Sequence, residues 1–427
     1  MLIVAIAFVI LMLMGMPLAF AIGVSGVLFF LQHPELPATI PIQVTVSQTQ
    51  NFALLAVPLF IIAGNLMNKA GISERLLDLA TVMTGRLRGG LAQVSFALSA
   101  LMGGVSGSAI ADAAMQSRML GEQMVERGLP RGFAAAVLSF GAVLTPIIPP
   151  GIGMILYGTI GQVSIGRLFA AGLLPAFLLW VSLAIAVWVV SKRRGYEPQR
   201  IRALSWKERG KALQAGIWAL LFPIFLLVGL RMGVFTPSEI GAFAVVYAVF
   251  IGIVAYRCLT LEGFFDAMRS SLTDVGSVVF LIAMSAIFSY GIVFERVPEM
   301  IAQGIMGITD NLQLVMLMVV GLVICIGFFI DATVLIIMLT PIFLPLITTL
   351  GGDPVHFGMV FIVAATIGNF TPPVGAAMYA VCSIMKVSIG AYTRESVPLL
   401  LAVSLVTIAL IFLPDLVLLL PNLLFNR

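Results

Sequence analysis

The residues of this chain that could hold an ion or a small anion lie in four glycine- and proline-rich stretches within apolar sequence. These stretches are residues 103–112, 141–151, 327–333 and 368–375. Inside a bilayer every backbone polar group needs a partner, so irregular backbone is tolerated only where it faces protein or a water-filled cavity. We therefore interpret the first and third stretches as tips of helical hairpins, and the other two as breaks within long helices.

A helix that is broken in this way has free carbonyl groups at one half-end and free amide groups at the other. Carbonyl oxygens, together with the oxygens of Ser, Thr and Asn, suit a hard cation such as sodium. Amide groups at a helix N-terminus suit a carboxylate. We therefore expect each hairpin tip and its neighbouring break to form a cation site, with an anionic solute between the two sites.

Two aspartates lie at the predicted hairpin tips. Asp112 ends the first stretch and Asp331 lies within the third. An ionisable side chain at membrane depth is a candidate for ion or solute binding by default, and the alternative is that each carboxylate only caps a half-helix. A helix kink, or the close packing that Gly103 and Gly107 permit, would explain one irregular stretch by itself. Four stretches in two matched pairs favour a binding site.

The chain repeats itself at a shift of 224 residues, without gaps. The segment 163–166, Val-Ser-Ile-Gly, returns as 387–390. The other matched pairs are Gly103 with Gly327, Gly128 with Gly352, Pro130 with Pro354, Phe133 with Phe357, Pro149 with Pro373, Gly151 with Gly375 and Met154 with Met378. Repeats in an apolar chain usually build the two halves of a transporter around a central site. The shift does not pair Asp112 with Asp331, so the halves differ in their tip chemistry.

Composition places the chain in a membrane. Of its 427 residues, 61% are hydrophobic and 10% are charged, which is far outside the range of soluble domains. The apolar runs predict about ten or more helical passes and two re-entrant elements.

Three scattered cysteines, Cys258, Cys325 and Cys382, indicate neither a disulfide framework nor a metal site, and His33 and His356 are expected in loops. The sequence contains no metalloprotease, nucleophile-elbow or phosphate-loop motif, so we expect no enzyme activity.

Charged loops predict the topology. The basic stretch 192–211 is expected to be a cytoplasmic linker, and the net charge of +4 reflects loop placement and not a nucleic-acid partner. The predicted parts are a first repeat (1–191) with hairpin 1 (about 90–123) and a broken helix (131–158), the linker (192–211), and a second repeat (212–427) with hairpin 2 (about 312–350) and a broken helix (357–384). Counting crossings from the linker, hairpin 1 enters from the cytoplasm and hairpin 2 from the outside. Matched segments that enter from opposite sides form an inverted repeat.

The remaining segments are expected to support these parts. Ser73–Arg86 and Thr260–Asp274 mix apolar and charged residues and are predicted to be arm helices on the membrane surface, which brace a moving domain. Gly15-Met16-Pro17 is expected to divide residues 2–31 into two short spans, with the N-terminus outside. The start lacks a basic leader and a small-residue cleavage site, so we interpret it as a span and not as a removed signal peptide.

At these tips and breaks the chain resembles the large membrane subunit of a tripartite ATP-independent periplasmic (TRAP) transporter. The resemblance runs over essentially the whole chain and rests on residues 15–23 (GMPLAFAIG), 104–112 (GVSGSAIAD), 149–151 (PPG) and 369–375 (NFTPPVG). It implies an all-α polytopic membrane protein, an elevator-type secondary transporter with an inverted repeat, two re-entrant hairpins and broken transmembrane helices. It also implies uptake driven by a sodium gradient, in which a transport domain moves against a scaffold.

The resemblance further implies two protein partners and a substrate. The partners are a small four-helix membrane subunit and a periplasmic binding protein, which captures an organic acid such as a C4-dicarboxylate or a sialic acid. Because the chain starts directly at the large subunit, the small subunit is expected to be a separate polypeptide. The implied location is the bacterial inner membrane, among lipids, with sodium as the coupling ion and no organic cofactor.

Transferred by position, the family's site residues fall on the tips and breaks. Those expected to bind sodium are Gly104, Ser106, Ser108, Thr145, Gly327, Gly368, Asn369 and Thr371, and those expected to bind substrate are Ser106, Ser108, Asp112, Asp331, Thr333 and Pro373. The second tip lacks the Ser-Gly-Ser run of the first. We therefore expect the two halves to contribute unequally to cation and solute binding.

Two kinds of alternative remain open. A stand-alone sodium-coupled anion symporter of similar fold would need no binding protein, and neighbouring genes for a small membrane protein and a secreted binding protein would argue against it. An intramembrane enzyme would need clustered nucleophiles or metal ligands, and a passive channel would need no sodium gradient.

Overall fold

The fold consists of helices throughout the described part of the chain. The computed structural model describes residues 2–198, 205–307, 309–373 and 375–425. In the first half the helices are α1 (Leu2–Leu13), α2 (Leu18–Gln32), α3 (Ile40–Thr49), η1 (Phe52–Leu55), α4 (Ala56–Lys69), α5 (Ile72–Thr84), α6 (Leu91–Gly103), α7 (Ala109–Glu126), α8 (Arg131–Ala142), η2 (Thr145–Ile147), α9 (Ile152–Ile160) and α10 (Ile165–Arg194).

The second half continues with the same kind of elements. Its helices are α11 (Trp206–Arg231), α12 (Pro237–Phe250), η3 (Ile251–Ala255), α13 (Leu261–Phe294), α14 (Val297–Met306), α15 (Leu312–Gly327), α16 (Ala332–Thr349), α17 (Pro354–Phe370), α18 (Ala376–Met385), α19 (Ile389–Phe412) and α20 (Pro414–Phe425). The hairpins expected near 90–123 and 312–350 correspond to the pairs α6–α7 and α15–α16, and the predicted broken helices correspond to α8–α9 and α17–α18.

The helix boundaries repeat at the 224-residue shift. The last residue of α6 maps onto the last residue of α15, and the first residues of α9 and α10 map onto those of α18 and α19. The repeated Val-Ser-Ile-Gly segment has a local cause, because its serine caps a helix in both halves. Ser164 Oγ accepts a hydrogen bond from the backbone amide of Arg167, and Ser388 Oγ accepts one from Ala391. The sequence repeat thus marks a repeated helix start.

Proline ends the first segment of each broken helix. Pro146, Pro149 and Pro150 follow α8, and because they lack a backbone N–H they cannot continue its hydrogen-bond ladder. The segments Arg131–Ile147 and Ile152–Ile160 are bent by 44° at this break. In the second half, α17 ends before Pro372 and Pro373, and α18 starts after Gly375.

The chain is a multi-pass membrane protein. Among the described residues, 7 helices are long and apolar enough to cross a membrane, or up to 8 if the bent pair forms one span. This number is smaller than the expected count of passes because breaks divide other apolar segments into helices of 10–17 residues. The residues 2–31 divide as expected into α1 and α2. Which broken segments cross, and from which side, stays a prediction.

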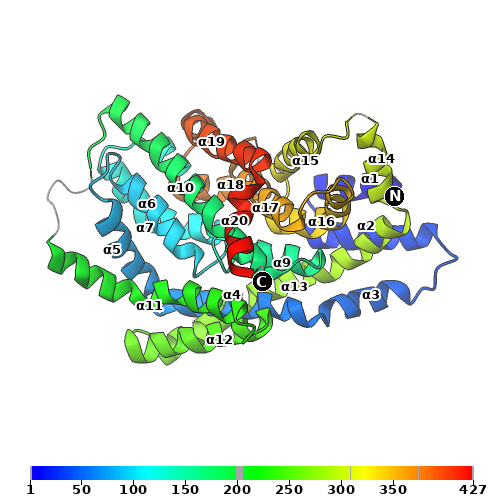
Figure 1. The fold of residues 1–427 in the computed structure, drawn as a ribbon, viewed down its shortest axis with the longest axis horizontal. Coiled ribbons are helices and arrows are strands. Elements are labelled where there is room, and N and C mark those ends of the chain that lie inside the picture. Colours follow the sequence, from blue (N-terminus) through cyan, green and yellow to red (C-terminus); the bar gives the residue numbers. More distant parts are fainter. Residues whose placement is uncertain (1, 199–204, 308, 374, 426–427) are drawn as a thin grey trace.

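Helix α17 is the centre of the fold. Every residue from Val355 to Phe370 is buried, as expected for a helix that is apolar on all sides. It packs against α10, α15 and α16, and Figure 1 shows it near the middle of the molecule. A second group is centred on α4, which packs against both α12 and α13, with α2 and α3 on α13.

Two local expectations are corrected by the structure. The segment 260–274 is not a separate arm helix, because α13 runs without interruption from Leu261 to Phe294. His356 does not lie in a loop. Pro354 is the first residue of α17, a position where its missing N–H is not needed, and His356 follows in the first turn. Its Nε2 atom lies 2.7 Å from the carbonyl oxygen of Leu410, in a buried position.

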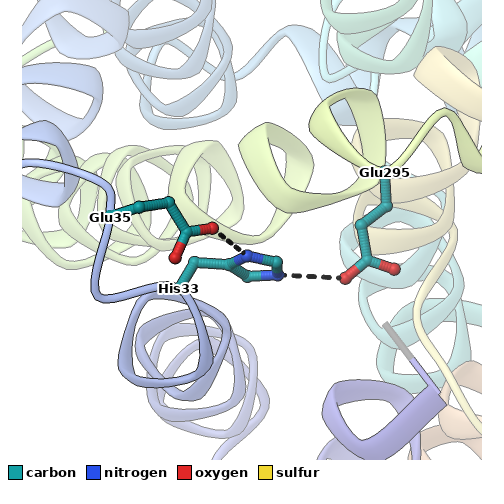
Figure 2. Close-up of polar contacts among 3 residues, drawn as sticks. All are labelled: His33, Glu35 and Glu295. Atoms are coloured by element: carbon teal, nitrogen blue, oxygen red, sulfur yellow. Dashed lines mark hydrogen bonds and ion pairs between the residues drawn. The ribbon is translucent and has the colours of Figure 1, made fainter.

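A polar contact joins the end of α2 to the end of α13. Figure 2 shows His33 between two carboxylates, with Nδ1 2.7 Å from Glu35 Oε1 and Nε2 3.4 Å from Glu295 Oε1. The hydrogen bond to Glu35, followed by the contact with Glu295, raises the pKa of His33 above its ordinary value near 6.5. The protonated imidazolium is therefore favoured at this junction, which the sequence did not reveal because residues 33 and 295 are far apart.

Candidate functional site

Both hairpins and both broken helices meet at an internal cavity of about 150 Å³. The central cavity, as we call it, lies where α7 and α16 begin, beside the first break and the end of α17. Its lining residues are Gly107, Ser108, Ala109, Ile110, Pro146, Ile152, Gly153, Asp331, Ala332, Thr333, Ile336, Ile362, Thr366 and Asn369. Four predicted site residues are therefore brought together: Ser108, Asp331, Thr333 and Asn369.

Glycine lets the first hairpin tip touch the first break. Gly107 has a positive φ of +61°, and a Cβ atom there would lie 2.5 Å from the carbonyl oxygen of Pro150. At Gly103 a Cβ atom would lie 2.7 Å from the Cβ of Ile148. With a larger residue at either position, the hairpin tip could not lie this close to the break. The spacing of these glycines therefore serves the contact between tip and break.

The second tip contacts the second break in a corresponding way. The backbone amide of Gly375 donates a 2.7 Å hydrogen bond to the carbonyl oxygen of Phe328. Gly327 and Gly368 are also in close contact, since a Cβ atom on Gly368 would lie 2.7 Å from the Cα of Gly327. Both of these glycines were predicted to bind sodium. In the structure they allow α15 and α17 to approach each other closely.

Asp331 links the second hairpin to the second broken helix. As the N-cap of α16 it accepts a 2.8 Å hydrogen bond from the backbone amide of Thr333 through Oδ1. Its Oδ2 atom accepts a 3.0 Å hydrogen bond from Asn369 Nδ2. The remaining oxygen of Asn369, Oδ1, is buried and has no hydrogen-bond partner among the described residues. The residues that line the central cavity thus include a carboxylate and an amide whose oxygen has no hydrogen-bond partner among the described residues.

Asp112 lies apart from the central cavity, in a buried hydrogen-bond network. Its Oδ2 atom accepts hydrogen bonds from Ser99 Oγ at 2.7 Å and Thr145 Oγ1 at 2.8 Å. Gln116 Nε2 lies 3.0 Å from both carboxylate oxygens. The network joins both helices of hairpin 1 to the first break. Asp112 and Ser106 line a different cavity of about 350 Å³, together with residues of α4 and α5.

The remaining predicted residues take other positions. Ser106 Oγ is buried without a partner in the described structure, whereas Ser108 Oγ caps α7 by accepting from the amide of Ala111. Thr371 Oγ1 donates to the carbonyl oxygen of Ile367, and it does not line the central cavity. A Cβ atom on Gly104 would lie 2.5 Å from Pro223 of α11. Pro373 is exposed and lies outside the central cavity.

Sequence reasoning missed three polar residues of these sites. Thr366 lines the central cavity one turn before Asn369 on α17. Ser99 and Gln116 complete the network around Asp112. The spacing of polar residues could have indicated them, because residues three or four positions apart share a helix face. Polar residues with this spacing occur at positions 366 and 369 and at positions 112 and 116.

The arrangement suits binding of a small ion or solute. The amide ends of α7 and α16 both reach the central cavity, and helix N-termini attract anions. The available oxygen atoms come from hydroxyl, amide and carboxylate groups, which hard cations prefer. Within the described ranges, no group of three or more His, Cys, Asp or Glu residues could hold a transition metal.

Comparison with known proteins gives a consistent result. A family model described as "Tripartite ATP-independent periplasmic transporter, DctM component" matches residues 5–416. The large permease protein of a sialic acid TRAP transporter from Vibrio cholerae is 32% identical over 409 residues, covering 96% of this chain and 95% of that protein. The large permease protein of the 2,3-diketo-L-gulonate TRAP transporter from Escherichia coli is 31% identical, covering 95% of each chain.

Two further similarities extend this comparison. The large permease protein of a C4-dicarboxylate TRAP transporter from Rhodobacter capsulatus is 29% identical over 428 residues, with 97% of each chain covered. Among solved structures, the YdaH transporter of Alcanivorax borkumensis has a similar fold, with a TM-score of 0.62, 15% identity and 86% of each chain covered.

The fold and the site together define a class of protein. An all-α, multi-pass membrane protein with broken helices around an internal cavity has the architecture of a transporter permease. The family model, which matches nearly the whole chain, defines the family more closely. The chain belongs to the family of large permease subunits of TRAP transporters, whose members are transporters and not enzymes.

Proposed function

We propose that this subunit drives uptake of an organic acid with a sodium gradient. The observation that carries the proposal is the central cavity, where the two hairpin tips meet the two broken helices. A site formed by broken helices offers oxygen atoms to a cation and amide groups to a carboxylate. The central cavity contains both kinds of group within one small volume.

Unpaired oxygen atoms support the sodium part of the proposal. Ser106 Oγ at the first tip and Asn369 Oδ1 at the second break are buried without hydrogen-bond partners in the described part of the chain. A buried polar atom without a partner is unfavourable, and a bound sodium ion would satisfy each oxygen. One such oxygen in each half is consistent with two unequal cation sites.

The substrate class follows from the cavity and from the relatives. The relatives are named for sialic acid, 2,3-diketo-L-gulonate and C4-dicarboxylates, all of which carry a carboxylate. In this chain the amide ends of α7 and α16 would face that carboxylate, while Ser108 and Thr333 would bind its oxygen atoms. We therefore propose import of an organic acid of the sialic acid or C4-dicarboxylate type.

The proposal includes partners and a movement. A small four-helix membrane subunit and a periplasmic binding protein would complete the transporter in the bacterial inner membrane. Two packed groups support an elevator movement: the hairpins and broken helices contact one another, and α4, α12 and α13 form the second group. The first group would carry the solute across the membrane while the second stays fixed.

Uptake into proteoliposomes tests the proposal. The chain is reconstituted with and without the two partners, and uptake of N-acetylneuraminate and of succinate is measured with an imposed sodium gradient. We expect uptake to require both the gradient and the binding protein. Uptake that ignores sodium would disprove the coupling, and full uptake without the binding protein would favour a stand-alone symporter.

At the level of single residues, Ser106→Ala should raise the sodium concentration needed for half-maximal uptake about tenfold, as expected for a ligand oxygen that contributes about 1.4 kcal/mol. Expression should stay near normal, because Ser106 Oγ has no hydrogen bond to lose in the described structure. An unchanged sodium requirement would remove Ser106 from the cation site.

A further inference from the structure

A second large cavity lies between the two packed groups of helices. The side cavity, as we call it, has a volume of about 590 Å³ and is bordered by α3 and α13 on one side and by α9 and α16 on the other. Pockets for small organic ligands usually have volumes of about 300–1,000 Å³. The side cavity is therefore large enough for a solute the size of a sugar.

Helix α3 presents a polar face to this cavity. Gln43, Ser47 and Gln48 of α3 line it, as does Asn51, which caps the start of η1. Ile42 and Val46, which do not line the cavity, are exposed apolar residues of the same helix. In a membrane protein the apolar face suits lipid, and a row of amides and hydroxyls requires water, protein or a ligand.

Most of these polar groups have no protein partner. The side chains of Gln43, Ser47 and Gln48 form no hydrogen bond with any described residue. On the α13 side, Ser285 is 1% exposed, and its Oγ atom is buried without a partner in the described structure. Ser289, one turn further along α13, also lines the cavity. Gln43 and Ser47 are exposed and Gln48 is half-buried, so the costly group is the buried, unpartnered Ser285 Oγ. Together with the polar α3 side chains that line the same cavity, it indicates a place for a hydrogen-bonding ligand.

The lining is uncharged, with polar groups set in a mostly apolar surface. Its side chains on α3, α9 and α13 are amides, hydroxyls and apolar groups, and among the described residues none of them is Asp, Glu, Lys or Arg. Amides and hydroxyls both donate and accept hydrogen bonds, as the hydroxyl groups of a sugar do. A compact dicarboxylate would bring two charges to a place without a cation, which is unfavourable.

The side cavity is next to the central cavity along two shared helices. On α16, Ile336 lines the central cavity, whereas Ile337 and Pro341 line the side cavity. On α9, Gly153 lines the central cavity and Thr159 lines the side cavity. A solute held in the side cavity would therefore lie against the same two helices that form the central site.

We propose that the side cavity binds the polyhydroxylated part of the transported organic acid, so that the substrate is a sugar acid and not a compact dicarboxylate. This inference rests on the proposed uptake of an organic acid. Ser285, Gln43 and Ser47 bind hydroxyl groups of the solute, and the cavity forms a second solute site beside the central one.

Cysteine protection tests the site without measuring transport. Cys258 and Cys325, which are exposed, are first replaced by Ser in the full-length chain. Ser47→Cys and Ser289→Cys are then introduced separately on the two sides of the cavity. Thr49→Cys is the matched control, because Thr49 is an exposed residue of α3 that does not line the cavity. The purified variants are held in lipid nanodiscs, so that a water-soluble thiol reagent reaches both faces.

Labelling rates are measured with N-acetylneuraminate, D-gluconate or succinate present. We expect the two polyhydroxylated acids to slow labelling of Ser47→Cys and Ser289→Cys about tenfold at about ten times their Kd, and to leave Thr49→Cys unchanged. Succinate should protect neither cavity position. Equal protection by succinate, protection of the control, no protection by either polyhydroxylated acid, or no reaction at Ser47→Cys would each overturn the inference.

The outcome is independent of the uptake measurement. Labelling needs no sodium gradient and no binding protein, so protection is measured in the same way if coupling fails. Conversely, sodium-driven uptake of succinate without protection at these positions would support the proposed function and disprove the side-cavity site.

Discussion

Asn369 donates a 3.0 Å hydrogen bond from Nδ2 to Asp331 Oδ2, which joins the second broken helix to the second hairpin. The first half contains a corresponding bond, in which Thr145 Oγ1 donates to Asp112 Oδ2 at 2.8 Å. The aspartates are not repeat equivalents, because the shift places Asp331 opposite Gly107. Each half therefore uses an aspartate of its own to hold a hairpin against a break, but only the second one lines the central cavity.

Replacing Asn369 should impair transport. Asn369→Ala removes both the hydrogen bond to Asp331 and the unpaired Oδ1 atom. A hydrogen bond to a charged group contributes about 1.5–3 kcal/mol, so we expect initial uptake to fall about 10- to 100-fold. The measurement is uptake into proteoliposomes at equal amounts of protein. Thr407→Ala is the control, because it removes a buried hydroxyl of α19 that bonds only to a backbone carbonyl. Equal rates for both variants would contradict a role for Asn369.

Replacing Asp112 should mainly destabilise the fold. Asp112→Ala leaves three buried donors, from Ser99, Gln116 and Thr145, without their acceptor, and breaking such a buried network costs about 3 kcal/mol or more. We expect a clearly lower melting midpoint for the purified variant in the same detergent. Ser117→Ala, at the residue directly after Gln116 on α7, removes a single bond to a backbone carbonyl and should cost about 1 kcal/mol. Similar midpoints for the two variants would show that the network is not structural.

The contact between Gly107 and Pro150 can be tested with a matched glycine. Gly107→Ala adds a Cβ atom 2.5 Å from the carbonyl oxygen of Pro150, at a φ of +61°. Gly128 also has a positive φ, +87°, but nothing lies within 4 Å of a Cβ atom there. Both variants bear a backbone penalty of about 1–2 kcal/mol, and only the first also separates tip from break. Uptake should therefore fall about tenfold or more for Gly107→Ala and stay near wild type for Gly128→Ala. The opposite order would contradict the contact.

The sequence predicted the positions of the breaks because their causes are local. Proline after α8 and α17, and glycine at each tip, limit the backbone whatever packs around it. The same local reasoning singled out Asp331, whereas Ser108, Thr333 and Asn369 were transferred by position from the family resemblance. The structure brings all four to one cavity. The repeated serine caps explain the matching Val-Ser-Ile-Gly segment, the longest match at the 224-residue shift.

Features that depend on packing could not be predicted in this way. The assignment of Asp112 to one cavity and Asp331 to another follows from which helix lies against each carboxylate. Ser99 and Gln116 could not be assigned a role from the sequence, because their bonds to Asp112 depend on how α6 packs against α7. The side cavity could not be predicted from α3 alone, because α13, which is far away in the sequence, supplies part of its lining. Continuity of α13 was missed because its charged start resembled a separate surface helix.

The contact of His33 with Glu35 and Glu295 predicts a pH dependence of stability. The two carboxylates raise the pKa of His33 in the folded chain above the value near 6.5 of an ordinary histidine. Protonation is therefore more favourable in the folded state than in the unfolded state. For a group of this kind, the stabilising contribution is complete below the pKa of the unfolded state and is lost as the pH rises through the folded-state pKa.

We expect the melting midpoint of the purified chain to decrease as the pH rises from about 5 to about 8, over the range in which His33 loses its proton. His33→Gln keeps a polar side chain at the junction of α2 and α13 but cannot become charged, so this part of the pH dependence should disappear. Thr407→Ala is the control, because it removes a buried hydroxyl that bonds to a backbone carbonyl and does not titrate in this pH range, so its midpoint should decrease with pH as that of wild type does. If the midpoints of wild type and His33→Gln change in parallel with pH, the charged contact does not stabilise the junction.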